Sequence, residues 1–244
     1  MLKYLTMLVV LFIIIIIGFI VVVPFTHSSD EKSKVIMFGR STMSLWFKHW
    51  NWPYPLRIKT TYKPWPIPYK KYSKGRLYME YYEMEGPKDN YPDVPFGVNM
   101  LKSVEAGLAG GKYDAAFFKF CFVDFPVKEK EEKDKRLIEL KNTVIKVHEM
   151  TSSRAMKLII GNALPLPKPN EATIQIQRDY NDWLIEFASD RKDVMIFDLF
   201  GPLSDNNGRM IMELTHAKGD HHPGEKAFSL LDKTFFPQVE GFLV

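Results

Sequence analysis

Segments typical of strands alternate with segments typical of helices along most of this chain, and this alternation restricts its possible folds. Short apolar runs typical of strands lie at residues 34–38, 76–82, 115–122, 156–160 and 194–199. Helix-like stretches lie at residues 42–49, 99–109, 128–148, 174–189 and 224–235. The alternation predicts an α/β protein, a three-layer α/β/α sandwich with a mainly parallel sheet and helices on both faces.

An uncharged apolar run at residues 5–23 precedes the predicted domain and ends before Pro24. It approaches the roughly 20 residues that a helix needs to cross a bilayer. It is also longer than the apolar region of about 7–15 residues in a typical cleavable signal. We therefore predict a membrane anchor at residues 1–30, with a signal peptide removed near Thr26 or Ser28 as the alternative. Lys3 stands ahead of the run, so the positive-inside tendency places the following residues outside the cytoplasm.

Residues 31–244 are predicted to form one domain, which is large enough to bury a substantial core. Cys121 is the only cysteine, so an intrachain disulfide is excluded. The formal net charge of +4 is mild, and we expect no nucleic-acid partner. Between residues 50 and 95, prolines alternate with aromatic residues, which predicts an extended surface insertion. Its aromatic rings either form a sugar-binding wall or only pack onto the domain.

Ser41 follows a short apolar strand and precedes a predicted helix, in the segment Gly39-Arg40-Ser41. A serine at such a turn has the free N–H groups of the helix N-terminus beside its oxygen, as a nucleophile requires. Serine is also a favoured N-cap, so the local sequence leaves both roles open. Near the other end of the chain, residues 219–224 supply two imidazoles and a carboxylate in a turn-rich segment. An early nucleophile with a late base is an order that an α/β hydrolase can use.

These segments resemble the conserved blocks of the SGNH (GDSL-type) hydrolase superfamily, from about residue 35 onward. Gly39-Arg40-Ser41 is similar to its Gly-Asp-Ser block, and His222 followed by proline is similar to its last block. Gly97 stands at a plausible glycine turn, and Asp124 matches the final position of the Gly-x-Asn-Asp block. The resemblance implies a flavodoxin-like sandwich and a divergent member of the superfamily.

The resemblance also implies roles for individual residues. Ser41 is the expected nucleophile, His222 the base and Asp220 the acid, although Asp220 could equally cap the following helix. His221 is the rival base. The N–H groups of Ser41 and Gly97 are the expected oxyanion donors.

Several residues depart from the family pattern. Arg40 replaces a carboxylate, and it either binds an anionic substrate or pairs with Asp124. Val123 replaces an asparagine and has no side-chain donor, so either the site is weakened or another group, such as Asn99 or Asn162, supplies that hydrogen bond. The cluster of histidines near Asp220 has no matched second set, and we expect neither a metal nor another cofactor.

The residues and the resemblance together predict a membrane-anchored serine esterase or O-deacetylase. Its substrates would be small acyl esters, with an acylated small molecule or a cell-envelope glycan as partner. One alternative is a non-catalytic protein of the same fold that binds or helps to modify polysaccharide. Another is an O-acyltransferase, because a sugar hydroxyl can intercept the same acyl-enzyme.

Overall fold

The computed structural model describes residues 32–50, 70–85, 95–127, 130–217 and 220–244. The predicted anchor at residues 1–30 and most of the predicted insertion at 50–95 lie outside these ranges. Within the described ranges, no helix combines the length and the apolar character needed to cross a bilayer.

A six-stranded sheet forms the centre of the domain, in the order β2-β3-β1-β4-β5-β6. Five of its strands run parallel, and β2 pairs antiparallel with β3 at one edge. Without β2, the parallel strands have the order second, first, third, fourth, fifth, which is the flavodoxin-like order. The predicted mainly parallel sheet is therefore confirmed. The strands are β1 (Ser33–Gly39), β2 (Lys70–Lys74), β3 (Leu77–Glu83), β4 (Ala115–Lys119), β5 (Lys157–Gly161) and β6 (Val194–Phe197).

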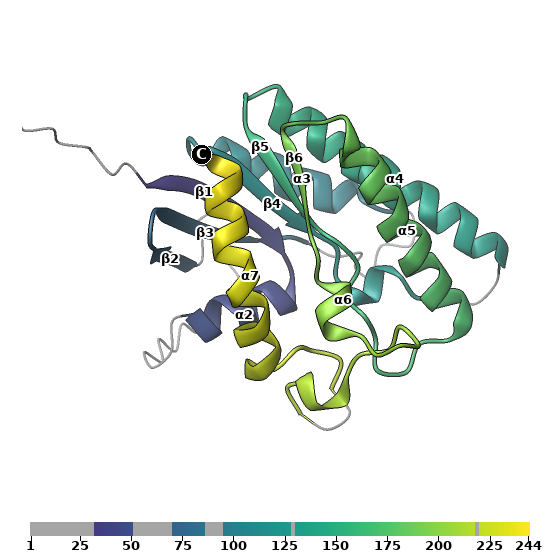
Figure 1. Ribbon diagram of the computed structural model, residues 1–244. Coiled ribbons are helices and arrows are strands. Elements are labelled where there is room, and N and C mark those ends of the chain that lie inside the picture. The colour runs from purple at the N-terminus through teal and green to yellow at the C-terminus, as the bar shows by residue number, and fades with distance from the viewer. Residues whose placement is uncertain (1–31, 51–69, 86–94, 128–129, 218–219) are drawn as a thin grey trace, which may run out of the picture. The chain divides into compact units, whose positions relative to one another are not determined.

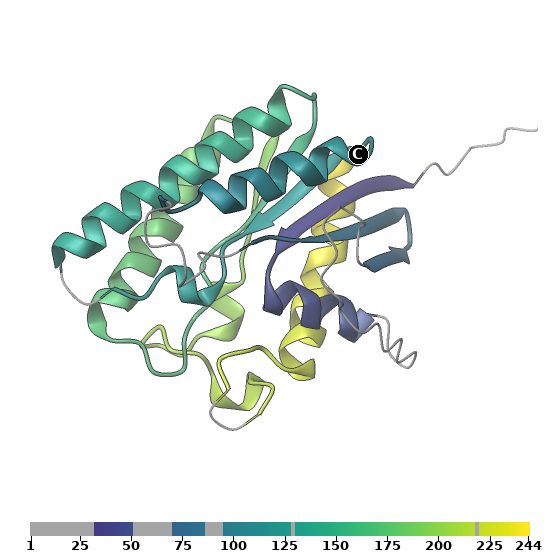
Figure 2. The ribbon, with the colours of Figure 1, turned by 180° about the vertical axis from the view of Figure 1, so that it is seen from behind.

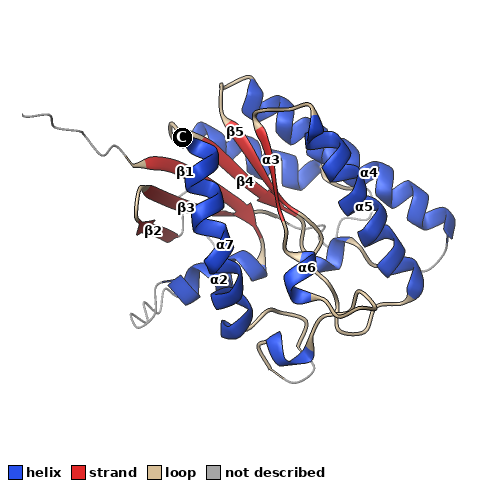
Figure 3. Cartoon of the chain, viewed as in Figure 1, coloured by secondary structure: helices blue, strands red, loops and turns tan. Residues whose placement is uncertain are grey.

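Helices cover both faces of this sheet, as Figures 1 and 2 show from opposite sides. One face carries α2 (Ser41–Trp50) and α7 (Glu225–Leu243). The other carries α3 (Val98–Ala109), α4 (Lys130–Ser152) and α5 (Glu171–Ser189). Three short elements complete the described chain: η1 (Phe122–Asp124), α6 (Phe200–Leu203) and η2 (Met212–Leu214). Figure 3 shows the strands enclosed between the two helical layers.

The apolar strands divide their side chains between two cores. In β1, Val35 and Met37 pack in the core on the α2 and α7 side, while Ile36 and Phe38 pack in the core on the other side. All four side chains are almost completely buried. Successive residues of a strand point to opposite faces, so a strand covered on both sides needs an unbroken apolar run.

Several predicted boundaries differ from the structure. Helix α4 continues to Ser152 where an end at residue 148 was predicted, and α5 begins at Glu171 where residue 174 was predicted. Helix α7 was predicted to end at residue 235, but it continues through Pro237 to Leu243. Phe236 and Val239 are buried, and their packing outweighs the loss of one N–H hydrogen bond at the proline. The third strand was predicted to end at residue 122, but β4 ends at Lys119.

Part of the predicted insertion belongs to the sheet. Strand β2 pairs with β3, and the Tyr72 ring stacks on Trp50 at a centroid distance of 5.1 Å. Trp50 is only 8% exposed. The Tyr72 ring therefore packs onto the domain and does not belong to a sugar-binding wall.

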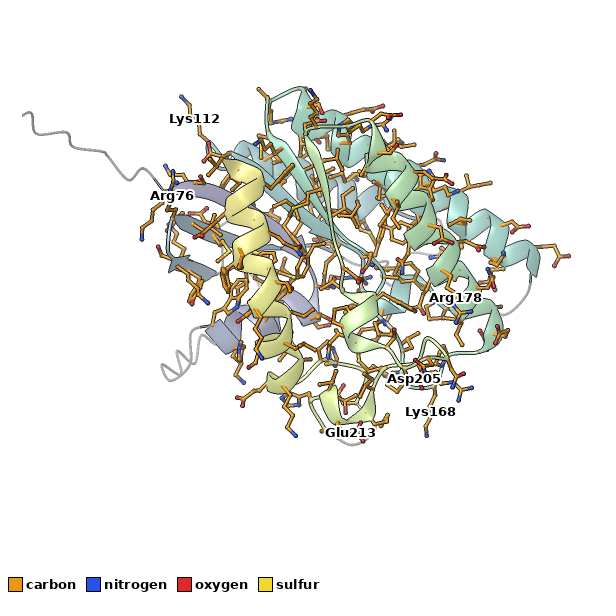
Figure 4. The ribbon with its side chains drawn as sticks, in the orientation of Figure 1. Arg76, Lys112, Lys168, Arg178, Asp205 and Glu213 are labelled. Atoms are coloured by element: carbon orange, nitrogen blue, oxygen red, sulfur yellow. The ribbon has the colours of Figure 1, made fainter. Side chains whose placement is uncertain are left out.

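The carboxyl ends of the parallel strands lie at one edge of the sheet. Figure 4 shows Arg76 and Lys112, which precede β3 and β4, at one end of the domain. The same view shows Asp205 and Glu213, which follow β6, at the opposite end. Open α/β sheets bind their ligands at the carboxyl edge, so the loops on that edge are the first place to look for a site.

Candidate active site

Ser41 is the first residue of α2, where the chain leaves the carboxyl end of β1, and it is exposed. The turn is tight, because a Cβ atom on Gly39 would lie 2.1 Å from Cγ of Met43. The Tyr81 hydroxyl of β3 donates to the Arg40 carbonyl at 3.2 Å and fixes the turn from the neighbouring strand. The N–H groups of Met43 and Ser44 donate to the same Arg40 carbonyl, at 2.8 and 3.2 Å, and close the first turn of α2.

Three of the predicted residues form a connected chain of hydrogen bonds. Ser41 Oγ lies 3.0 Å from His222 Nε2. His222 Nδ1 lies 2.7 Å from Asp220 Oδ1. The two ring nitrogens thus face different partners, which is the order that nucleophilic catalysis requires. Asp220 does not cap α7, because the N-cap is Gly224 and has no side-chain hydrogen bond.

Asp220 is held in its ionised form by this arrangement. The hydrogen bond from the His222 side chain lowers the pKa of Asp220, and the backbone N–H of His222, at 3.0 Å from Oδ1, adds to the effect. An ionised carboxylate can only accept, so Nδ1 of His222 donates to it. In the neutral ring with its proton on Nδ1, Nε2 is the acceptor for the Ser41 hydroxyl.

The segment that carries His222 is fixed by backbone hydrogen bonds to the chain around η2. His216 N–H donates to the His222 carbonyl at 2.8 Å, and Gly224 N–H donates to the Leu214 carbonyl at 2.7 Å. The Phe122 ring of η1 meets the His222 ring edge-on, with centroids 5.1 Å apart. Phe122 was not predicted as a site residue, because nothing distinguished it from the apolar strand before it. His221 is exposed, and its ring lies 5.7 Å from the same phenylalanine.

Arg40 forms an ion pair with Asp124. The Asp124 side chain is fully buried, and its second oxygen accepts the Cys121 N–H at 2.7 Å, which closes the turn into η1. Arg40 was predicted either to bind an anionic substrate or to pair with Asp124, and the structure shows the pairing. The pair joins the turn before Ser41 to the turn that carries Phe122.

Lys119 is a buried cation beside this pair, and its place in an apolar run gave no sign of it in the sequence. It is 1% exposed, and its Nζ donates to the Phe120 carbonyl at 2.9 Å. Burial lowers the pKa of Lys119 to about 8, with a smaller contribution from Arg40 in the same direction.

Of the predicted oxyanion donors, Gly97 has a backbone conformation that the structure fixes. Gly97 is the N-cap of α3 with φ of 84°, and a Cβ there would lie 2.4 Å from Oγ1 of Thr143, so the position requires glycine. Val123 is 50% exposed and offers no donor. Asn162 was one possible substitute, but its amide donates to Asp198 and accepts the Leu199 N–H, so it holds the turn after β6. Asn99 lies in the first turn of α3.

The histidine cluster near Asp220 consists of side chains that can ligate zinc. In the described part of the chain, no group of three or more His, Cys, Asp or Glu side chains is placed to hold a metal ion.

Solved structures of esterases and lipases have the same fold. A candidate acylhydrolase from Bacteroides fragilis has a TM-score of 0.60 at 13% identity, with 87% of this chain and 88% of that chain covered. A GDSL-like lipase from Bacteroides thetaiotaomicron has a TM-score of 0.59 at 12% identity, with 87% and 89% covered. A carbohydrate acetylesterase from Sinorhizobium meliloti has a TM-score of 0.53 at 13% identity, with 86% and 99% covered.

Sequence comparison finds no such match. No protein-family model and no curated protein matches this chain. At 12–13% identity, the structural similarity establishes a shared fold. The resemblance seen in the sequence is thus confirmed for the architecture: this chain has the fold of the GDSL-type hydrolases, in a divergent form.

Proposed function

We propose that the protein is a serine esterase that forms an acyl-enzyme on Ser41. The observation that carries the proposal is the chain of contacts from Ser41 Oγ to His222 Nε2 at 3.0 Å and from His222 Nδ1 to Asp220 at 2.7 Å. Its position at the carboxyl edge of a parallel sheet supports the proposal, because ligands bind there in open α/β folds.

In the proposed mechanism, Ser41 Oγ attacks the ester carbonyl carbon while His222 Nε2 takes the hydroxyl proton. The carbonyl oxygen becomes an oxyanion and accepts hydrogen bonds from the N–H groups of Ser41 and Gly97. The oxyanion then collapses, and the leaving alcohol takes the proton from His222. Asp220 stays ionised throughout and stabilises the imidazolium.

Water completes the cycle. His222 removes a proton from a water molecule as the water attacks the acyl carbonyl carbon. The second oxyanion collapses, the bond to Ser41 Oγ breaks, and His222 returns its proton to that oxygen. The products are the carboxylic acid and the free enzyme.

For the substrate, we propose small acyl esters, including acetyl groups on envelope carbohydrate. The shared fold with a carbohydrate acetylesterase supports this class. The apolar run at residues 5–23 supports a membrane-anchored enzyme whose domain faces away from the cytoplasm. Removing residues 1–30 should release the protein from washed membranes. Continued membrane association of the truncated protein would contradict the anchor.

A fluorophosphonate probe tests the nucleophile directly. The purified full-length protein in mild detergent should be labelled, and Ser41→Ala should abolish labelling. Ser153→Ala removes an exposed serine at the other end of the sheet and serves as the matched control. A folded wild-type protein that the probe does not label would contradict the proposal.

A second candidate function rests on Val123, which stands half-exposed where the family has its asparagine donor. Loss of one oxyanion donor costs about 10²–10³ in rate in known hydrolases. The protein would then be a non-catalytic polysaccharide-binding relative. Glycan binding that survives Ser41→Ala, with no turnover of any aryl ester, would favour this alternative.

A further inference from the structure

The Ser41–His222 contact joins the first residue of α2 to the segment that leads into α7. Ser41 begins α2, and His222 stands just before α7, which begins at Glu225. Both helices cover the same face of the sheet and contact each other, as seen in Figure 1. The residues in contact are 181 positions apart in the chain. The distance between them therefore depends on how α2 packs against α7, together with the hydrogen bonds that fix the His222 segment to the chain around η2.

Asp232 of α7 forms the polar contact between these helices. Its Oδ1 accepts hydrogen bonds from the indole N–H groups of Trp46 and Trp50, each at 2.8 Å. Its Oδ2 lies 3.0 Å from the Trp50 nitrogen and 3.5 Å from His49 Nε2. The carboxylate is 16% exposed, so it stands largely out of water between the helices.

Aromatic packing surrounds the carboxylate and leaves the indoles little freedom. Trp46 is 1% exposed and Trp50 is 8% exposed. The Trp46 ring lies 4.9 Å from Phe235 of α7 and stacks on Phe228 at 6.0 Å, measured between centroids. Trp46 and Trp50 are four residues apart and thus share one face of α2. Asp232 accepts from the N–H groups of both buried indoles, and a buried donor that loses its acceptor is costly.

We propose that Asp232 is a positioning residue that fixes α2 against α7 and so holds Ser41 Oγ within reach of His222 Nε2. This inference rests on the proposed esterase function. The carboxylate does not touch the reacting atoms, because Trp46 lies more than one helical turn beyond Ser41 on α2. Misplacement of reacting groups by about 1 Å can cost about 10²-fold in rate, so a small shift between the helices matters.

Asparagine is a conservative replacement for Asp232. Both 2.8 Å indole bonds go to the same oxygen of Asp232. Asparagine keeps one acceptor oxygen of the same geometry, so Asp232→Asn can retain both bonds. Asp232→Ala removes the acceptor and leaves two buried donors unpaired, and α2 must shift for them to find other partners.

Hydrolysis of p-nitrophenyl acetate by the full-length protein tests the role. For Asp232→Ala we expect kcat to fall about tenfold or more, with KM changed less than about twofold, because the defect lies in geometry and not in binding. Asp232→Asn should stay within about threefold of wild type. Asn170→Ala, which removes the N-cap of α5 on the other face of the sheet, is the control for destabilisation alone and should also stay within about threefold.

Rates are corrected for the folded fraction measured by denaturant titration. A kcat for Asp232→Ala that equals the wild-type value, or that falls no further than in Asn170→Ala, would overturn the positioning role while the esterase function stands. A wild-type protein without any hydrolysis or probe labelling would overturn both. If Asp232→Ala does not fold, Trp46→Phe replaces it, since that variant keeps a ring and removes one donor. Its kcat should fall about threefold at constant KM, and an unchanged kcat would overturn the role.

Discussion

Two clusters in this molecule contain the same three side-chain types but differ in how these are connected. At the carboxyl edge of the sheet, His222 uses Nδ1 for Asp220 and Nε2 for Ser41. At the other edge, Asp193 and Ser152 both meet Nε2 of His148, at 2.9 and 3.1 Å.

In the second cluster, each of the three side chains contacts both of the others. Ser152 Oγ donates directly to Asp193 at 3.1 Å, so its proton already has a carboxylate partner. Asp193 immediately precedes β6 and Ser152 ends α4, so the cluster ties a helix end to the start of a strand. Composition alone thus does not make a nucleophile. What matters is a histidine with one nitrogen for the acid and the other for the serine.

The largest expected effect comes from removing each histidine in turn. His222→Ala should lower kcat/KM for p-nitrophenyl acetate at least about 10³-fold, because the serine loses its base. His148→Ala should leave it within about twofold, since that cluster lies at the opposite edge of the sheet. Steady-state kinetics on both variants check the contrast, and equal losses would mean that the two clusters are not functionally different.

The next effect concerns the acids. Asp220→Asn should lower kcat about 10²–10⁴-fold, because an amide can stabilise the wrong tautomer of His222 and cannot support its charged form. Asp193→Asn should leave kcat unchanged. A pH–rate profile of the Asp220 variant gives an independent measurement. If its activity matched wild type, the site would work as a Ser–His dyad.

Lys119 lies near Arg40, which precedes Ser41. Its buried charge should make the free energy of unfolding depend on pH in the alkaline range. Its pKa is lowered to about 8 in the folded protein, against 10.5 for an ordinary lysine. The unfolded chain binds more protons between these values, so the stability of wild type should rise as pH increases from about 8 to 10.5.

Lys119→Met removes this buried charge. Below pH 8 it should be more stable than wild type, by up to about 3 kcal/mol from the shift of 2.5 pKa units (10.5 minus 8). Urea denaturation at several pH values tests this. A gain that does not shrink above pH 8 would show that packing, and not charge, is responsible.

The smallest expected effect is the loss of folding stability at low pH that comes from Asp193 in the His148 cluster. Burial raises the pKa of Asp193, but hydrogen bonds from His148 and Ser152 outweigh it, and the pKa is lowered overall. A lowered folded-state pKa contributes stability at neutral pH that is lost as pH falls through it. The stability difference between wild type and Asp193→Asn should therefore be small at neutral pH and should shrink as pH falls below the ordinary aspartate pKa of about 3.9. A difference that persists there would point to a structural role of the carboxyl group in its protonated form.

The sequence predicted the parallel sheet because strands covered on both faces require unbroken apolar runs, and these are easily recognised. It did not predict β2, since Lys70–Lys74 is a short polar edge strand without such a run. The end of α7 was missed because burial of Phe236 and Val239 overrides the proline signal.

The same distinction applies to the candidate site. Ser41 and His222 stand in short segments with a recognisable order, so they could be selected from the sequence. Phe122 and Asp232 act through contacts with distant residues, and no local pattern marks such contacts. The burial of Lys119 results from the packing of the whole sheet, which the local sequence does not show. Asp193 illustrates the point, because its partners on α4 lie more than forty positions earlier.

The separation of Ser41 from the Asp220–His222 pair has a consequence for protein synthesis. Base and acid are close neighbours in the chain, whereas the nucleophile was translated 181 residues before its base. A nascent chain on the ribosome therefore carries the serine without the group that activates it. Reactivity toward esters should appear in one step, late in synthesis, when the segment around His222 emerges and docks beside α2.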